Sequence, residues 1–97
     1  MTTAQPQSVA GSADYQSIVD WLLEKVAFYL EVPVTGIEPT GKLVEYGLDS
    51  VYALALVGDI EDEYEIEVEP TLAWDHPTVA AIAGLVRDLI AESRTAS

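Results

Sequence analysis

The sequence predicts an all-α domain, a small bundle of three long helices and one short helix. Apolar residues recur at spacings of three and four in three separate segments, which is the period of an amphipathic helix. Hydrophobic residues make up 49% of the 97 residues, enough for a modest core in a chain of this size. No strand-like segment has a second one to pair with, so a sheet is not expected.

The first helix is expected from about Asp14 to Leu30. Asp14 or Ser12 is a suitable N-cap, because both side chains can accept a hydrogen bond from the first turn. Val32 and Pro33 should prevent the helix from continuing, since the residue before a proline is pushed out of helical geometry. Its apolar stripe comprises Tyr15, Ile18, Val19, Leu22, Val26 and Leu30.

A long irregular segment follows, from Glu31 to Asp49. Loops of this length are uncommon in compact domains and are often functional. Proline and glycine interrupt it at Pro33, Gly36, Pro39, Gly41 and Gly47. We expect its scattered apolar residues to hold the loop against the core; these are Val34, Ile37, Leu43, Val44 and Leu48.

The second helix is predicted from Ser50 to Tyr64. Its core stripe comprises Ala53, Leu56, Val57, Ile60 and Tyr64. A surface helix normally has one apolar face, but this helix has a second, formed by Val51, Leu54, Ala55 and Gly58. The second face must therefore be covered by the loop or left for a partner.

The rest of the chain is predicted to contain an extended connector and two helices. Glu65 to Glu69 alternates acidic and apolar residues, and we expect Val68 to point inward. A short helix is expected at Leu72 to Trp74, with Trp74 in the core. The third long helix should open near Pro77, where a missing amide hydrogen does no harm. Its stripe comprises Val79, Ile82, Ala83, Val86, Leu89 and Ile90.

The two ends of the chain show no helical pattern. Residues 1–13 are predicted to be a flexible leader, residues 14–91 the folded domain and residues 92–97 a short disordered tail. The leader has neither a basic start nor an apolar core, so it does not resemble a targeting signal. No apolar run approaches the roughly 20 residues that span a membrane. We therefore expect a cytoplasmic protein that does not bind membranes.

The charge and the cysteine count exclude several functions. Seventeen acidic residues face four basic ones, giving a net charge of −13. Such a surface repels nucleic acid and anionic lipid, and it either attracts basic proteins or only keeps the chain soluble. The chain has no cysteine and a single histidine. It therefore lacks disulfides, a thiolate metal site and a nucleophile–base pair, and we predict neither a metal centre nor an enzyme.

Ser50 is the residue in the best position for chemistry. It follows Gly47, Leu48 and Asp49 and opens an amphipathic helix. Glycine permits a tight turn, and the amides and dipole at a helix N-terminus favour an anion such as a phosphodiester. For an isolated serine, however, N-capping is the commoner role. Asp49 could cap the helix or contact an enzyme that modifies the serine.

Two longer motifs add a family resemblance. The segment from Leu43 to Val51 is similar to the attachment motif of acyl carrier proteins, and Thr71 to Val79 resembles the segment before the last helix in carrier domains of modular polyketide synthases. Val51 stands where the attachment motif more often has a leucine, a mild departure that should not block modification. Ala55 and Gly58 replace larger or acidic residues common in bacterial fatty-acid carriers, which favours the polyketide type. The resemblance covers about residues 14–91 and implies a four-helix bundle of the acyl-carrier type.

The resemblance also implies a cofactor and a function. A phosphopantetheinyl transferase would attach 4'-phosphopantetheine from coenzyme A to Ser50, with Gly47, Leu48 and Asp49 forming the surroundings. The carrier would hold acyl or polyketide intermediates as thioesters and deliver them, without catalysing a reaction itself. The implied partners are a ketosynthase, an acyltransferase or acyl-adenylate ligase, and tailoring enzymes. The carrier itself would be a monomer.

The second apolar face of the Ser50–Tyr64 helix is the expected docking surface for these partners. We assign docking to Val51, Leu54, Ala55, Gly58, Glu61 and Asp62. The alternative is an acidic helical interaction module without the arm, which includes a carrier that has lost its modification. That alternative predicts that Ser50→Ala leaves function intact.

Overall fold

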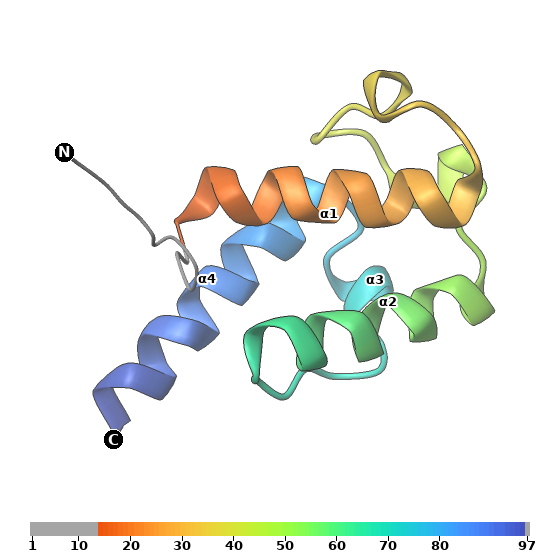
Figure 1. Ribbon diagram of the computed structural model, residues 1–97. Coiled ribbons are helices and arrows are strands. Elements are labelled where there is room, and N and C mark those ends of the chain that lie inside the picture. Colours follow the sequence, from red (N-terminus) through yellow and green to blue (C-terminus); the bar gives the residue numbers. More distant parts are fainter. Residues whose placement is uncertain (1–13, 97) are drawn as a thin grey trace, which may run out of the picture.

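The computed structural model describes residues 14–96 and shows four α-helices joined by irregular segments, as predicted (Figure 1). No strand occurs among these residues. The expected leader, residues 1–13, lies outside the described residues. The elements are α1 (Tyr15–Leu30), the 3-10 turns η3 (Val34–Gly36) and η4 (Leu43–Tyr46), α2 (Ser50–Tyr64), α3 (Leu72–Asp75) and α4 (Val79–Ala96).

Helices α1 and α2 begin and end where the sequence predicts. Asp14 and Asp49 are their N-caps, and each carboxylate accepts a hydrogen bond from the amide three residues further on, at 2.7 and 2.9 Å. Each helix ends at a glutamate in the left-handed conformation, Glu31 (φ 58°) and Glu65 (φ 56°). The left-handed residue stops the helix because its amide turns back onto carbonyls of the last turn.

Helix α4 differs from the prediction at both ends. It begins at Val79 rather than near Pro77, because Thr78 takes the capping role and its hydroxyl accepts a hydrogen bond from the Ala81 amide at 3.0 Å. The Pro77 carbonyl instead accepts a hydrogen bond from the loop. The helix continues to Ala96, so residues 92–96 are helical where we expected a tail. No glycine or proline interrupts this segment, and alanine, glutamate and arginine favour a helix.

The core lies where one face of each helix meets the others, and it contains most of the predicted stripes. Its largest fully buried side chains are Ile18, Leu22, Val26, Leu43, Leu56, Ile60, Leu72, Val79, Ile82 and Val86. Four aromatic or apolar residues expected to pack in or against the core are exposed instead: Tyr15, Val34, Val44 and Trp74. Trp74 lies on a one-turn helix, α3, whose buried side is already filled by Leu72 and Ala73.

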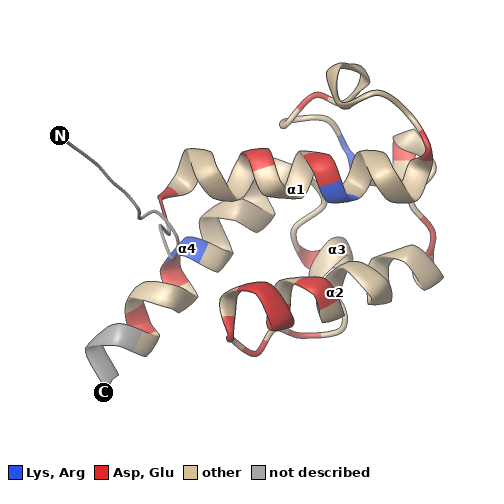
Figure 2. Cartoon of the chain, viewed as in Figure 1, with Lys and Arg blue, Asp and Glu red and all other residues tan. Residues whose placement is uncertain are grey.

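The arrangement of the helices places the loop and Ser50 at one end of the molecule. Helices α1 and α2 run in opposite directions, so the end of α1, the 31–49 loop and the start of α2 lie together (Figure 1). Acidic residues are concentrated on the second half of α2 and on the connector that follows it (Figure 2). Within residues 14–96, none of the helices has the length and apolar character needed to cross a membrane.

Candidate functional site

The turn into α2 depends on three residues before Ser50. Gly47 has φ 102°, a left-handed conformation that side chains other than hydrogen disfavour. Leu48 is buried in the core and anchors the turn. Asp49 is extended and caps the helix through its bond to the Tyr52 amide. The chain thus leaves the core at Leu48 and enters α2 at Ser50, which is exposed.

The hydroxyl of Ser50 is available for chemistry. Because Asp49 is the N-cap, Ser50 is the first residue inside the helix, and its side chain makes no hydrogen bond among the described residues. An exposed, uncommitted hydroxyl at the positive end of a helix suits a phosphodiester, since the free amides and the dipole favour negative charge there. The residues present therefore fit a phosphopantetheine arm.

Backbone hydrogen bonds join the 31–49 loop to Pro77 and to the start of α4. The Leu48 amide donates to the Leu43 carbonyl (3.2 Å), and the Leu43 amide donates to the Pro77 carbonyl (2.8 Å). A second link joins the Ala80 amide to the Pro39 carbonyl (2.9 Å). The two sequence motifs, around Ser50 and around Pro77, therefore lie together in space, and the second helps to hold the first.

Tyr46 and Gly41 form a close contact inside the loop. The Tyr46 hydroxyl accepts a hydrogen bond from the Glu38 amide at 3.1 Å. A Cβ atom at Gly41 would lie 2.6 Å from that hydroxyl oxygen and 2.9 Å from a ring carbon. Gly41 is therefore needed for the ring to pack. The sequence predicted Gly41 only as a break in the loop and no role for Tyr46, since their contact depends on loop geometry.

An aromatic row, defined by Phe28, Tyr29 and Tyr52, connects α1 to the first turn of α2. The Tyr29 ring stacks on the Tyr52 ring with centroids 5.6 Å apart, and the Phe28 ring meets the Tyr29 ring edge-on at 5.7 Å. The Tyr29 hydroxyl donates to the carboxylate of Asp59, which raises the pKa of Tyr29 to about 12. The row could not be predicted from the sequence, because it depends on how α1 packs against α2.

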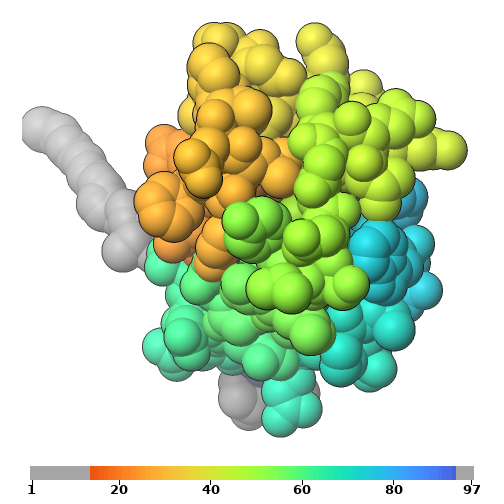
Figure 3. Space-filling view, turned by 90° about the vertical axis from the view of Figure 1, so that its right-hand side faces the viewer, coloured from red at the N-terminus to blue at the C-terminus, as the bar shows by residue number. Residues whose placement is uncertain are grey.

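Most of the residues expected to dock partners lie on the surface of α2. Val51 is 71% exposed and Leu54 is 55% exposed, values unusual for large apolar side chains. Gly58 and Asp62 are also exposed, while Ala55 is half-buried. The first turns of α2 share one face of the molecule with the end of α1 (Figure 3). The second apolar face predicted for α2 is therefore not covered by the loop.

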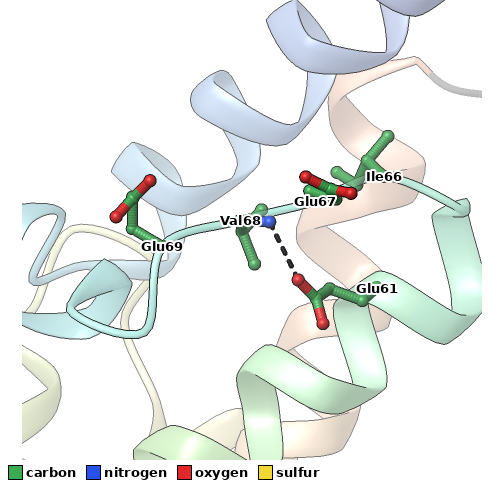
Figure 4. A pocket seen from close by; sticks show the side chains of 5 residues that line it. All are labelled: Glu61, Ile66, Glu67, Val68 and Glu69. Carbon is green, nitrogen blue, oxygen red and sulfur yellow. Dashed lines mark hydrogen bonds between the residues drawn. The ribbon is translucent and has the colours of Figure 1, made fainter.

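Glu61 differs from the other expected docking residues. It is half-buried, and its carboxylate accepts a hydrogen bond from the Val68 amide at 3.1 Å, which ties α2 to the connector (Figure 4). The connector is extended, and Val68 is partly buried against the core, as expected. Of the two neighbouring acids, Asp62 is thus the one that faces solvent without this structural bond.

A hollow of about 560 Å³ beside the connector is a weaker candidate site. Its lining consists of Glu61, Ile66, Glu67, Val68 and Glu69 (Figure 4). These residues provide carboxylates and apolar groups but no nucleophile and no base paired with one. Residues 14–96 also contain no cluster of three or more histidines or carboxylates able to hold a metal. The start of α2 is therefore the better site.

Comparison with known proteins matches this region to one family. The profile described as "Phosphopantetheine attachment site" matches residues 20–86, more than half of the chain. Among curated proteins, the chain is 30% identical over 91 residues to polyketide synthase ThaG of Burkholderia thailandensis and 28% identical over 79 residues to polyketide synthase PksN of Bacillus subtilis. These alignments cover 94% and 81% of this chain but only 2% and 1% of those synthases.

Two solved structures share the fold. A free-standing peptidyl carrier protein from an uncharacterized Acinetobacter baumannii secondary metabolic pathway is 38% identical, with a TM-score of 0.73, covering 84% of this chain and 98% of that one. The HMG-ACPI domain of the CurA module from Lyngbya majuscula has a TM-score of 0.75 at 22% identity, covering 96% and 93%. At that identity, the second match supports the fold alone.

Proposed function

Because this chain belongs to the phosphopantetheine attachment site family, whose members carry 4'-phosphopantetheine covalently, we propose that Ser50 is the residue that carries the arm. One observation supports this choice above the others. Within the matched residues 20–86, Ser50 is the only serine, and it is exposed at the start of α2 with its hydroxyl uncommitted. Asp49 performs the capping that would otherwise explain a serine at this position.

The proposed modification uses the Ser50 hydroxyl as a nucleophile. Its oxygen bonds to the phosphorus of coenzyme A nearest the pantetheine, and the bond from that phosphorus to the adenosine bisphosphate half breaks. The hydroxyl proton passes to the transferase or to solvent, and adenosine bisphosphate leaves. The free amides of the first turn of α2 would stabilise the charge of the phosphodiester. Gly47 and Leu48 fix the turn that presents Ser50.

The chain is a carrier domain of the polyketide synthase type, and such domains are generally not catalytic. When attached, the arm supplies the thiol that this cysteine-free chain lacks and holds an acyl group as a thioester. We propose that the carrier delivers acyl or polyketide intermediates to a ketosynthase, an acyltransferase or acyl-adenylate ligase, and tailoring enzymes. We further propose that it acts as a monomer in the cytoplasm, where coenzyme A and a transferase are present, and catalyses no reaction itself.

The decisive experiment measures the intact mass of the protein after incubation with coenzyme A, magnesium and a broad-specificity phosphopantetheinyl transferase. The wild type should gain one phosphopantetheine, and Ser50→Ala should gain none. Ser17→Ala is the matched control, because Ser17 is an exposed serine on α1, and this variant should gain the arm. A folded wild type that gains no mass would favour an acidic interaction module without the arm. An arm on Ser50→Ala would place the site elsewhere.

An amino-acid cargo is the second candidate, because the structure that is 38% identical is a peptidyl carrier protein. The curated relatives are polyketide synthases, which favours an acyl or polyketide cargo instead. Mass spectrometry of the thioester cleaved from carrier isolated from its producing cells distinguishes the two. An amino acid or peptide on the arm would contradict the polyketide assignment without affecting the assignment of Ser50.

A further inference from the structure

Phe28 is the most exposed of the large hydrophobic side chains in the described part of the chain. It is 76% exposed, more than Val51 (71%) or Leu54 (55%) on α2. Its helix buries a separate apolar stripe, so Phe28 contributes little to the core. An exposed phenyl ring on a folded domain is typical of a surface that a partner covers, since aromatic side chains are enriched at interface centres.

The ring of Phe28 packs on one side against another aromatic ring. It packs edge-on against Tyr29, whose own ring is fixed by its stack on Tyr52 and by its hydrogen bond to Asp59. The aromatic row therefore links Phe28 on α1 to the first turn of α2 through contacts at both helices. A ring that packs on a neighbour loses less conformational entropy on binding than a fully free one, which favours Phe28 as an anchor.

The row leads from Phe28 to the modification site. Two ring-to-ring steps, of 5.7 and 5.6 Å, separate Phe28 from Tyr52, and Tyr52 lies two residues after Ser50 on the same turn. A specific protein interface covers about 800 Å² on each partner, a patch roughly 30 Å across. The end of α1 and the start of α2 share one face of the molecule (Figure 3), so an interface of this size centred on Ser50 can include both.

The charges around the row indicate the chemistry of that enzyme surface. Asp49, Asp59 and Asp62 lie on α2 or at its start, and Glu31 follows α1. No lysine or arginine occurs from residue 43 to residue 86; the flanking bases are Lys42 in the loop and Lys25 on α1, whose amino group lies over the Trp21 ring. A complementary surface would place an apolar pocket beside lysines and arginines that face these acids, since like charges opposite them would repel.

We infer that Phe28 is an anchor residue for the phosphopantetheinyl transferase, which binds the end of α1 as well as the start of α2. The inference rests on the proposed attachment of the arm to Ser50. It adds a residue on α1, outside the apolar face of α2, to the recognition of the enzyme. Phe28 binds the enzyme and takes no part in the transfer itself, so its loss should affect the KM for the carrier and leave kcat unchanged.

The test is the kinetics of arm transfer by a broad-specificity phosphopantetheinyl transferase at saturating coenzyme A, with the carrier concentration varied. Phe28→Ala should raise the KM for the carrier about tenfold, while kcat stays within twofold of the wild type. Phe28→Lys should raise it further, because a lysine would repel the lysines and arginines of that surface. Tyr15→Ala is the matched control, because Tyr15 is an exposed aromatic residue at the opposite end of α1. The KM of the transferase for this variant should equal that for the wild type.

The outcomes separate this inference from the assignment of Ser50. If the wild type accepts the arm and neither Phe28 variant raises the KM by more than twofold, the anchor is overturned and the attachment site stands. An equal rise in KM for Tyr15→Ala would also overturn it, because the effect would then not be local to the row. If the wild type accepts no arm, both proposals fail together. Circular dichroism of each variant establishes that it is folded.

Discussion

The carboxylate of Asp49 accepts a hydrogen bond from the backbone amide of Tyr52 at 2.9 Å, so the bond spans Ser50 and Val51. The bond satisfies one of the free amides of the first turn and so performs the usual task of an N-cap serine. Because the neighbouring residue caps the helix, the Ser50 side chain is left exposed and its hydroxyl makes no hydrogen bond within the described residues. The structure thereby separates the residue that begins the helix from the residue that we propose is modified.

This separation predicts different stability effects for two adjacent substitutions. Asp49→Ala should lower the free energy of unfolding by about 1 kcal/mol, because it removes the cap. Ser50→Ala should change it by less than about 0.5 kcal/mol, since the serine side chain makes no contact that stabilises the helix. Urea denaturation followed by circular dichroism measures both. Equal losses for the two variants would mean that Ser50 contributes to the cap in solution.

The two faces of α2 predict a second contrast, between two leucines. Leu56 is fully buried and Leu54 is 55% exposed, although they lie two residues apart. Leu56→Ala should cost about 2–5 kcal/mol, because it leaves a cavity in the core. Leu54→Ala should cost about 0.5 kcal/mol or less. Thermal and urea unfolding of the two variants provide the comparison, and a large loss for Leu54→Ala would show that the apolar face is covered in solution.

The helices could be predicted from the sequence because their signals are local. The stripe of α2, the cap at Asp49 and the proline after α1 each act within a few residues, and the predicted bounds of α1 and α2 match the structure. The errors occurred where local signals are weak or compete. Pro77 is permitted in a first turn, but Thr78 is the stronger cap and takes the role.

The surroundings of the site could be predicted only in part. The Gly47 turn and the exposed face of α2 follow from residue types and helical period. The bond between Leu43 and Pro77 and the stack of Tyr29 on Tyr52 join segments far apart in the sequence. Such contacts depend on how the helices pack, and a single sequence contains no periodic signal for them.

The contact between Gly41 and Tyr46 predicts that two glycine-to-alanine substitutions have opposite effects. Gly41→Ala would place a Cβ atom 2.6 Å from the Tyr46 hydroxyl oxygen, so it should destabilise the domain by about 1–3 kcal/mol. Gly58→Ala meets no atom within 4 Å and lies inside α2, so it should stabilise the domain by about 0.5–1 kcal/mol. Urea denaturation measures both changes.

A double-mutant cycle identifies the cause of the loss at Gly41. If the ring of Tyr46 is responsible, Gly41→Ala should cost much less in a Tyr46→Ala background than in the wild type. The same cost in both backgrounds would show that the strain arises from the loop backbone instead. The rate of arm transfer to Gly41→Ala is a further readout, since the 31–49 loop leads directly to Ser50.

The bond between Tyr29 and Asp59 predicts a loss of stability at alkaline pH. The hydrogen bond to the Asp59 carboxylate, burial and the charge of that carboxylate raise the pKa of Tyr29 from 10.0 to about 12 in the folded chain. The folded state thus holds the proton more tightly, so this contribution is complete below pH 10 and is lost between pH 10 and about 12. Tyr64, whose pKa is raised to about 12 by burial and then by Glu63, contributes in the same range.

Urea denaturation across this pH range should therefore show a smaller decline in the free energy of unfolding for Tyr29→Phe than for the wild type, whereas Tyr15→Phe should follow the wild type. An identical decline in Tyr29→Phe would mean that the bond to Asp59 does not persist in solution, and the link from α1 to α2 would then rest on the stack with Tyr52 alone.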